Sequence, residues 1–192
     1  MIAGVVLAAG GASRFGSPKQ LAELEGRPLL QHAIDAMLGV SAVDPVVVVL
    51  GAAAERVREA LALRAARVVV CHDWAEGMAA SLRCGVEAVG DADWVIVTLG
   101  DQPRVTSEVI AAVANEAASA PAGVTAIRAM YDGVPGHPVA LSREMLPGVA
   151  KLRGDVGARE LLGSASVRTF EAGRLCDPVD VDTPEELEGL RT

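Results

Sequence analysis

Apolar, β-branched segments recur along the first half of the chain and alternate with segments whose apolar residues have helical spacing. The apolar runs cover 2–8, 45–50, 68–71 and 94–99, and the helical patterns lie near 28–38, 53–63, 78–89 and 106–118. Strands that are apolar throughout, rather than at every second position, are typical of a parallel sheet with helices on both faces. The pattern therefore predicts a three-layer α/β/α fold, Rossmann-like, with a mostly parallel sheet.

The second half of the chain is less regular. Short strand candidates at 123–128, 138–141 and 166–170 are interrupted by residues 133–136 and 153–157. A last helix is expected to begin within 183–186, where Thr, Pro and Glu follow one another as they do at helix starts. With 192 residues and no internal repeat or linker, the chain fits a single domain over 1–192.

Composition narrows the possible partners. The formal net charge is -8 and the pI is about 4.9, which argues against nucleic acid, because phosphate backbones are held by many cations together. No apolar run reaches the length of a membrane span, and the sequence starts with a strand pattern rather than the basic region of a signal peptide. We therefore expect a cytoplasmic protein without membrane contact.

The cysteines and histidines indicate no metal site of their own. Cys71, Cys84 and Cys176 are odd in number and form no C-x-x-C pair, so neither a disulfide framework nor a zinc site is expected. The three histidines also lack the spacing of metal ligands, and a single helical histidine such as His32 is more often a packing residue.

A glycine-rich loop at residues 9–19 follows the first apolar run directly. It carries Ser13, Arg14 and Lys19, and Lys19 is one of only two lysines in the chain. Bare backbone N–H groups and fixed cations at the end of a strand are typical of a phosphate-binding site. The alternative is a turn that only joins a strand to a helix.

The spacing of this loop excludes two common nucleotide motifs. Gly11 and Gly16 have the first spacing of a Walker A loop, but Ser17 and Pro18 stand where Lys and Ser or Thr are required. The glycines also do not form the G-x-G-x-x-G pattern of dinucleotide-binding folds. The loop is therefore expected to bind a triphosphate in another way.

A second polar turn, at residues 99–103, follows the apolar run at 94–99. In an open parallel sheet, ligands bind beyond the carboxyl ends of the strands, so Asp101 is expected near the glycine loop. A carboxylate there could hold Mg²⁺ against phosphate oxygens, because Mg²⁺ takes few protein carboxylates. The alternative is an ordinary turn aspartate.

An ordered set of motifs spans nearly the whole chain. It comprises LAAGGASRFGSPKQL, GRPLLQHAIDAM, WAEGMAASLRCGV, GDQPRVT, PGHPVALS, LRGDVGARELL and VDVDTPEEL. Together these motifs resemble the nucleotidyltransferases that complete the molybdenum cofactor by joining a nucleoside monophosphate to molybdopterin. The resemblance implies the nucleotidyltransferase fold, with a nucleotide-binding half at 1–120 and an acceptor-binding half at 121–192.

The resemblance also implies a reaction and its residues. The terminal phosphate of molybdopterin would attack the α-phosphate of the nucleotide and expel pyrophosphate, so catalysis would be positioning and charge neutralisation. Arg14 would hold the β- and γ-phosphates, Lys19 would lie at the α-phosphate, and Asp101 would bind Mg²⁺. The nucleotide-binding residues implied are Leu7, Ala8, Ala9, Gly10, Gly11, Ser13, Arg14, Lys19, Gly77 and Ser81.

Three of the implied assignments leave alternatives open. Asp182 resembles the second metal-binding carboxylate, but Asp180 would face the same side of a strand. Ser81 is either a base-binding residue or a plain helix serine. His137 and Asp155 are expected to face the acceptor, with His137 in an extended, exposed loop before Pro138; His137 either binds the acceptor phosphate or caps a turn.

The resemblance favours CTP as the nucleotide, because Ala9 matches the cytidylyl branch of the family, where the guanylyl branch has glycine. GTP remains an alternative. Two further alternatives are a nucleotidyltransferase for a sugar or polyol phosphate and a non-catalytic carrier that brings the cofactor to a molybdenum hydroxylase. The length of the chain favours molybdopterin over a sugar phosphate, and Lys19, Asp101 and Asp182 together favour catalysis over carriage.

Overall fold

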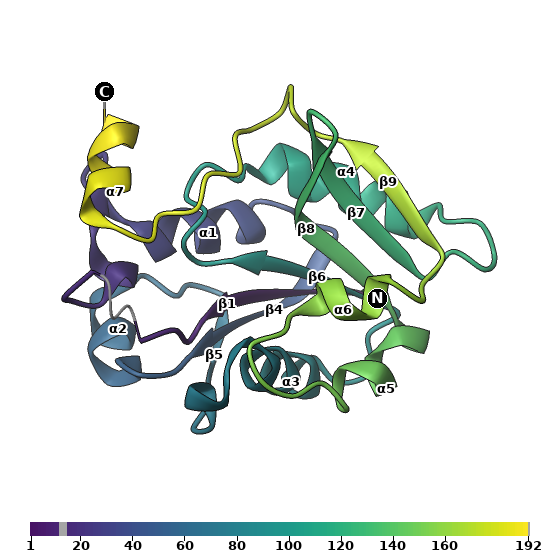
Figure 1. Ribbon diagram of the computed structural model, residues 1–192, viewed down its shortest axis with the longest axis horizontal. Helices are drawn as coiled ribbons and strands as arrows, with labels where there is room; N and C mark the ends of the chain where they lie inside the picture. Colours follow the sequence, from purple (N-terminus) through teal and green to yellow (C-terminus); the bar gives the residue numbers. More distant parts are fainter. Residues whose placement is uncertain (12–14, 192) are drawn as a thin grey trace.

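A seven-stranded sheet forms the middle layer of the molecule, in the order β5-β4-β1-β6-β8-β7-β9 (Figure 1). A computed structural model describes residues 1–11 and 15–191 of the chain. The strands of this sheet are β1 (Ile2–Ala8), β4 (Val43–Leu50), β5 (Arg67–Val70), β6 (Trp94–Leu99), β7 (Ala126–Tyr131), β8 (Val134–Ser142) and β9 (Val167–Glu171). A separate hairpin joins β2 (Glu23–Leu24) to β3 (Arg27–Pro28).

Helices cover both faces of the sheet. The α-helices are α1 (Leu29–Leu38), α2 (Ala54–Ala60), α3 (Met78–Val89), α4 (Ser107–Ala118), α5 (Leu146–Val149), α6 (Ala158–Leu162) and α7 (Pro184–Arg191), and the 3-10 turns are η1 (Lys19–Leu21), η2 (Trp74–Glu76) and η3 (Arg143–Met145). Figure 1 shows α1 and α4 on one side of the sheet and α3, α5 and α6 on the other. The predicted three-layer fold is confirmed.

Strand alternation explains the two apolar cores. In β1, Val6 and Ala8 face the core under α1 and α4, whereas Val5 and Leu7 face the core under α3. Successive side chains of a strand point to opposite faces, so a central strand with helices on both sides must be apolar at every position. This is why β1 and its neighbours are uninterrupted apolar runs in the sequence.

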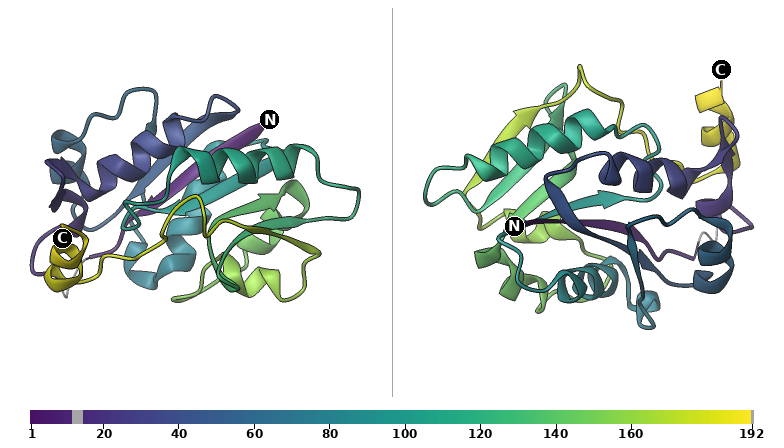
Figure 2. Two further views of the ribbon diagram at one scale, coloured as in Figure 1. Left: turned by 90° about the horizontal axis from the view of Figure 1, so that it is seen from above. Right: turned by 180° about the vertical axis from the view of Figure 1, so that it is seen from behind.

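The order in which strands are added to the sheet reverses at β1, with β4 and β5 on one side and β6 on the other. This strand is parallel to β4 on one side and to β6 on the other, so the loops after β1 and after β6 diverge. In open α/β sheets this divergence leaves a crevice beyond the carboxyl ends of the strands. Figure 2 shows the layers from above and from behind, with the segments that follow β1 and β6 at the same end of the sheet.

The second half of the chain completes the sheet with a hairpin. The predicted interruption at 133–136 is wrong, because only Asp132 and Gly133 form the turn between β7 and β8. Gly133 has a φ of 80°, a conformation that glycine adopts without strain, and the chain re-enters the sheet at Val134. Strand β8 is antiparallel to both β6 and β7, while β9 is parallel to β7.

The predicted last helix is α7, and it begins with a capping box. The Thr183 hydroxyl oxygen accepts from the Glu186 N–H at 3.2 Å, and the Glu186 carboxylate accepts from the Thr183 N–H at 2.9 Å. Leu187 and Val181 pack on Leu24 and Leu29, which fixes the preceding segment beside the carboxyl end of β6. Among the described residues, no helix combines the length and the apolar character needed to cross a membrane.

Candidate functional site

A cavity of about 480 Å³ lies beyond the carboxyl ends of β1 and β6. Its wall combines the end of β1 with the glycine loop, the start of α3 with η2, and the turn after β6. The sequence-predicted residues that line it are Leu7, Ala8, Ala9, Gly10, Gly11, Lys19, Gly77, Ser81, Asp101 and Asp155. Ser13 and Arg14, which the sequence also predicts, lie outside the described residues.

Lys19 joins the first half of the chain to the end of the second. Its ammonium nitrogen lies 2.6 Å from Asp101 Oδ2 and 2.7 Å from Asp182 Oδ1, and all three side chains are partly buried. Burial alone would lower the pKa of Lys19, but the charges and hydrogen bonds of Asp101 and Asp182 outweigh it, and the pKa is raised. Lys19 is therefore a fixed cation at the mouth of the cavity.

Gln20 holds the start of the glycine loop through two hydrogen bonds. It is 6% exposed, and its Nε2 donates to the carbonyls of Ala8 and Gly10, each at 2.9 Å. These two hydrogen bonds tie the glycine loop to the residue next to Lys19. The sequence analysis did not identify Gln20. The only available signal was its place between Lys19 and the apolar Leu21.

The start of α3 meets the acceptor half of the chain. Gly77 has a φ of 113°, and a Cβ on it would lie 2.5 Å from the carbonyl carbon and oxygen of Gly154, so no side chain fits there. The Ala79 N–H donates to the Gly154 carbonyl at 3.2 Å, and the Met78 N–H donates to Asp155 Oδ1 at 3.3 Å. Residues 154–155 thus cap α3 and close one side of the cavity.

Trp74 forms a wall of the cavity that sequence reasoning did not identify. A Cβ added at Gly11 would lie 3.1 Å from the Trp74 indole, and one added at Gly51 would lie 2.8 Å from Trp74 Cβ. The indole therefore stands against the glycine loop. An aromatic face at this place is suited to stacking on a nucleobase. Its signal was that it is one of only two tryptophans and stands three residues before Gly77.

The carboxylates beside Lys19 fit a divalent metal. Asp101 Oδ1 is buried and has no hydrogen-bond partner among the described residues, while its Oδ2 bonds to Lys19. An unsatisfied carboxylate oxygen at the edge of a cavity is a hard ligand of the kind that Mg²⁺ and Mn²⁺ prefer. Within residues 1–11 and 15–191, no three Asp, Glu, His or Cys side chains are arranged to hold a metal ion.

The structure distinguishes Asp182 from Asp180. Asp182 contacts Lys19, whereas Asp180 lines a neighbouring chamber. The pKa of Asp180 is raised by partial desolvation and by the nearby negative charge of Asp101. Residues 180–182 do not form a strand; the segment is held by one hydrogen bond from the Val181 N–H to the Asp101 carbonyl and by the buried Val181 side chain.

His137 lies outside the cavity, and its predicted environment is wrong in part. The backbone is extended as expected, but His137 belongs to β8 and is partly buried, and Pro138 is fully within the sheet rather than in an exposed loop. The pairing of Val139 with Val97 on β6 draws the segment inward. Burial, and then the charge of Arg128, lower the pKa of His137 to about 4, so the imidazole is neutral at pH 7.

Comparison with known proteins agrees with this geometry. The sequence profile described as "MobA-like NTP transferase domain" matches residues 4–169. One curated relative is the nicotine blue oxidoreductase of Paenarthrobacter nicotinovorans, which is 32% identical over 98% of this chain and 96% of its own.

Two solved structures are also similar over their whole length. Rv0371c from Mycobacterium tuberculosis H37Rv has a TM-score of 0.88 and 35% identity, covering 98% of this chain and 96% of its own. The structure of Rv0371c in complex with manganese has a TM-score of 0.83 and 33% identity, covering 98% and 97% of the two chains.

Proposed function

This chain belongs to the family of MobA-like NTP transferase domains and is a nucleotidyltransferase; from that premise we propose that it transfers CMP from CTP to the terminal phosphate of molybdopterin and releases pyrophosphate. The observation that carries the proposal is the placement of Lys19 between Asp101 and Asp182 at the mouth of the cavity. A cation and two carboxylates at the end of a phosphate-type loop are the charges that nucleotidyl transfer requires.

In this proposal, the nucleotide occupies the cavity with its base between Trp74 and Ser81 and its phosphates on the glycine loop. The loop N–H groups, aligned by Gln20, hold the β- and γ-phosphates together with Arg14. Lys19 lies at the α-phosphate, where negative charge gathers in the transition state. The acceptor phosphate is already an anion, so the chain needs no general base.

The metal expected in this site is Mg²⁺, held by Asp101 and Asp182. When bound, the ion neutralises phosphate charge and orients the leaving pyrophosphate. The unsatisfied Oδ1 of Asp101 supports this assignment, and so does the manganese complex of a similar protein. Asp101 and Asp182 would hold the ion beside the triphosphate, and Lys19 lies between the two carboxylates and offsets their mutual repulsion.

The acceptor enters from the side of Asp155 and His137. Asp155 lines both the nucleotide cavity and the neighbouring chamber, so it lies on the boundary between the two substrates. The product would then pass to a molybdenum hydroxylase in the cytoplasm.

Purified protein, Mg²⁺, molybdopterin and each nucleoside triphosphate in turn test the proposal, with pyrophosphate release as the readout. We expect release with CTP that depends on molybdopterin. Pyrophosphate release with GTP but not CTP would make the protein a guanylyltransferase. Release only in the presence of a sugar or polyol phosphate would show that this compound, rather than molybdopterin, is the acceptor. Tight molybdopterin binding without turnover would indicate a carrier. Because one relative is named an oxidoreductase, NAD(P)H consumption by the same protein is the control for redox activity.

A further inference from the structure

A second chamber, of about 470 Å³, lies beside the nucleotide cavity. The two adjoin each other, because Met78, Leu99 and Asp155 line both. The far side of the second chamber is built by the β7–β8 hairpin, by the start of α6 and by residues 178–180. A molecule in this chamber would therefore lie next to a nucleotide in the first cavity.

Arg128 lies in the wall of this chamber, and no carboxylate of the described residues forms an ion pair with it. It is partly buried in β7, its Nε is fully buried, and this atom has no hydrogen-bond partner among the described residues. By contrast, Arg168 on the adjacent strand β9 pairs with Glu116 at 2.7 Å. A half-buried guanidinium without an anion is costly, which points to a ligand that supplies one.

Arg159 adds a second cation to the same wall. It lies in the first turn of α6, lines the chamber with Arg128, and no ion pair within the described part of the chain neutralises it. Burial, and then the charge of Arg159, lower the pKa of Arg128, so the two guanidinium groups feel each other across the chamber. Two like charges without a counter-ion repel, and an anion between them would reverse that penalty.

Among the described residues that line this chamber, the two arginines are the only side chains that can hold an anion by charge. His137 lines the same wall but is neutral at pH 7, with a pKa of about 4. Asp155 and Asp180 also line the chamber, and burial, and then the nearby charge of Asp101, raise the pKa of Asp180. These carboxylates repel a phosphate that approaches the site beside Lys19, and the arginines offset that repulsion.

We propose that Arg128 and Arg159 form an oxyanion site that holds the phosphate monoester of the acceptor in the second chamber. The assignment rests on the proposed function for the identity of the acceptor. Arg128, with its fork of N–H donors, fixes the orientation of the phosphate, and Arg159 closes over it from the exposed side. An oxygen of this phosphate then bonds to the α-phosphorus of the nucleotide, the bond from that phosphorus to the bridging oxygen breaks, and pyrophosphate leaves with the electron pair.

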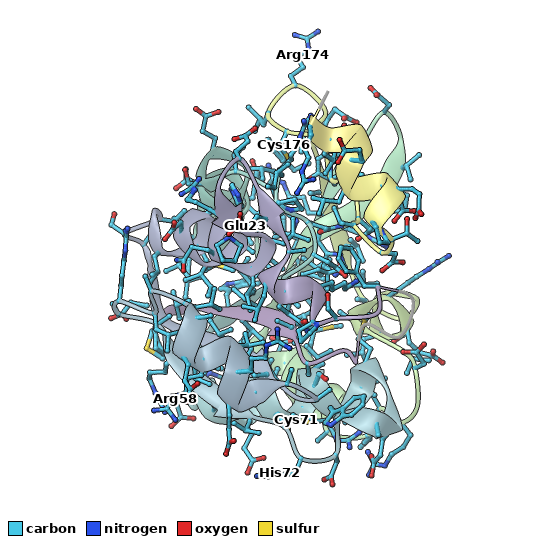
Figure 3. The ribbon with its side chains drawn as sticks, turned by 90° about the vertical axis from the view of Figure 1, so that its left-hand side faces the viewer. Glu23, Arg58, Cys71, His72, Arg174 and Cys176 are labelled. Carbon is cyan, nitrogen blue, oxygen red and sulfur yellow. The ribbon has the colours of Figure 1, made fainter. Side chains whose placement is uncertain are left out.

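Direct binding tests the site without relying on turnover. Protein saturated with Mg²⁺ and the α,β-methylene analogue of CTP is titrated with phenyl phosphate by calorimetry. We expect Arg128→Met to weaken binding at least tenfold and Arg159→Met several-fold, with partial recovery in Arg128→Lys. Arg58→Met is the matched control, because Arg58 is exposed on α2 and points away from the molecule in Figure 3; its binding should equal that of the parent.

Further readouts separate this inference from the proposed function and from misfolding. A melting temperature of Arg128→Met at or above that of the parent shows that the arginine is kept for binding rather than for folding. In turnover, Arg128→Met should raise the KM for the acceptor and leave the KM for CTP unchanged. Phenyl phosphate binding that depends on Arg128, without turnover of molybdopterin, would retain the site and reject the acceptor. Turnover with an unchanged acceptor KM in both arginine variants would reject the site and retain the function.

Discussion

The ammonium of Lys19 and the carboxylate of Asp101 are 2.6 Å apart, although they are 82 residues apart in the chain. The contact joins the loop after β1 to the turn after β6, the two segments that diverge where the strand order reverses. Asp182 approaches the same ammonium from the segment before α7. Three regions of sequence thus converge on one cation at the mouth of the cavity.

Removing either member of this pair should abolish most of the activity. We expect Lys19→Ala and Asp101→Asn to lower kcat by roughly 10²–10³, the scale for losing one transition-state charge contact. Steady-state pyrophosphate release measures this. Lys151→Ala is the control, because Lys151 is the other lysine and is exposed. Near-normal kcat at saturating substrate and metal in either variant would contradict its assigned role.

The next prediction is that the Mg²⁺ site is complete only when a nucleotide is bound. Mg²⁺ should bind tightly only when CTP or its analogue is present, because the ion needs phosphate oxygens to complete its six ligands. Calorimetric titration with and without nucleotide measures this, and both Asp101→Asn and Asp182→Asn should weaken the nucleotide-dependent binding. Asp177→Asn, an exposed aspartate on the same segment, should not. Tight binding to the free protein would disprove the prediction.

Gly77 offers a test of how the cavity is closed. In Gly77→Ala the new Cβ would meet the Gly154 carbonyl at 2.5 Å, at a backbone φ of 113°, so residues 154–155 must move away from α3. We expect a KM for CTP at least several-fold higher and a loss of stability on the order of 1–3 kcal/mol. Gly163→Ala is the control, since its nearest neighbour would be 3.7 Å away. Parent-like kinetics in Gly77→Ala would show that this contact does not shape the site.

His137 should make the stability of the protein depend on pH. Its pKa is about 4 in the folded chain and 6.5 in the unfolded chain, so the unfolded state binds the proton first as the pH falls. The contribution of the neutral imidazole is complete above pH 6.5 and is lost between pH 6.5 and 4, on the order of 1–3 kcal/mol. Urea unfolding at several pH values should show this slope in the parent and in His72→Gln, but not in His137→Gln. His72 is labelled in Figure 3 on the outer surface.

The strands of the first half of the chain and the site residues at their ends were predictable, because the hydrophobic pattern marks the strands and the polar motifs follow them directly. The apolar runs at 2–8 and 94–99 coincide with β1 and β6, and the crevice rule then placed the glycine loop next to Asp101. The choice between Asp180 and Asp182 was not predictable, since it depends on Val181 bonding to the Asp101 carbonyl.

Other features depend on contacts between distant segments, which no local pattern encodes. Arg128 reads as one polar residue in a short apolar strand, and only the fold shows that it faces Arg159 in a chamber. Likewise, the sequence 133–136 looks like a break because glycine and proline are turn residues. Pairing with β7 nevertheless brings Val134 and Pro135 into β8.

Base choice is the remaining prediction, and it concerns Ala9. This residue is 3% exposed and lies in the cavity wall, and its carbonyl accepts from the Ala52 N–H at 3.3 Å. The methyl group stands where glycine would leave more room for a purine, so CTP should be preferred over GTP. A volume difference of this kind is worth about 1–3 kcal/mol, or roughly 10–200-fold in specificity.

Measuring kcat/KM for CTP and GTP in the parent and in Ala9→Gly decides whether this methyl group selects the base. The variant should narrow the ratio by raising the value for GTP while CTP use is largely kept. Ala52→Gly is the control for a general loosening of the loop, because Ala52 is exposed and its N–H donates to the Ala9 carbonyl. This variant should leave the CTP-to-GTP ratio of kcat/KM unchanged. An unchanged ratio in Ala9→Gly, or equal use of both nucleotides by the parent, would place the selectivity in the wall formed by Trp74 and Ser81, since those residues also line the cavity.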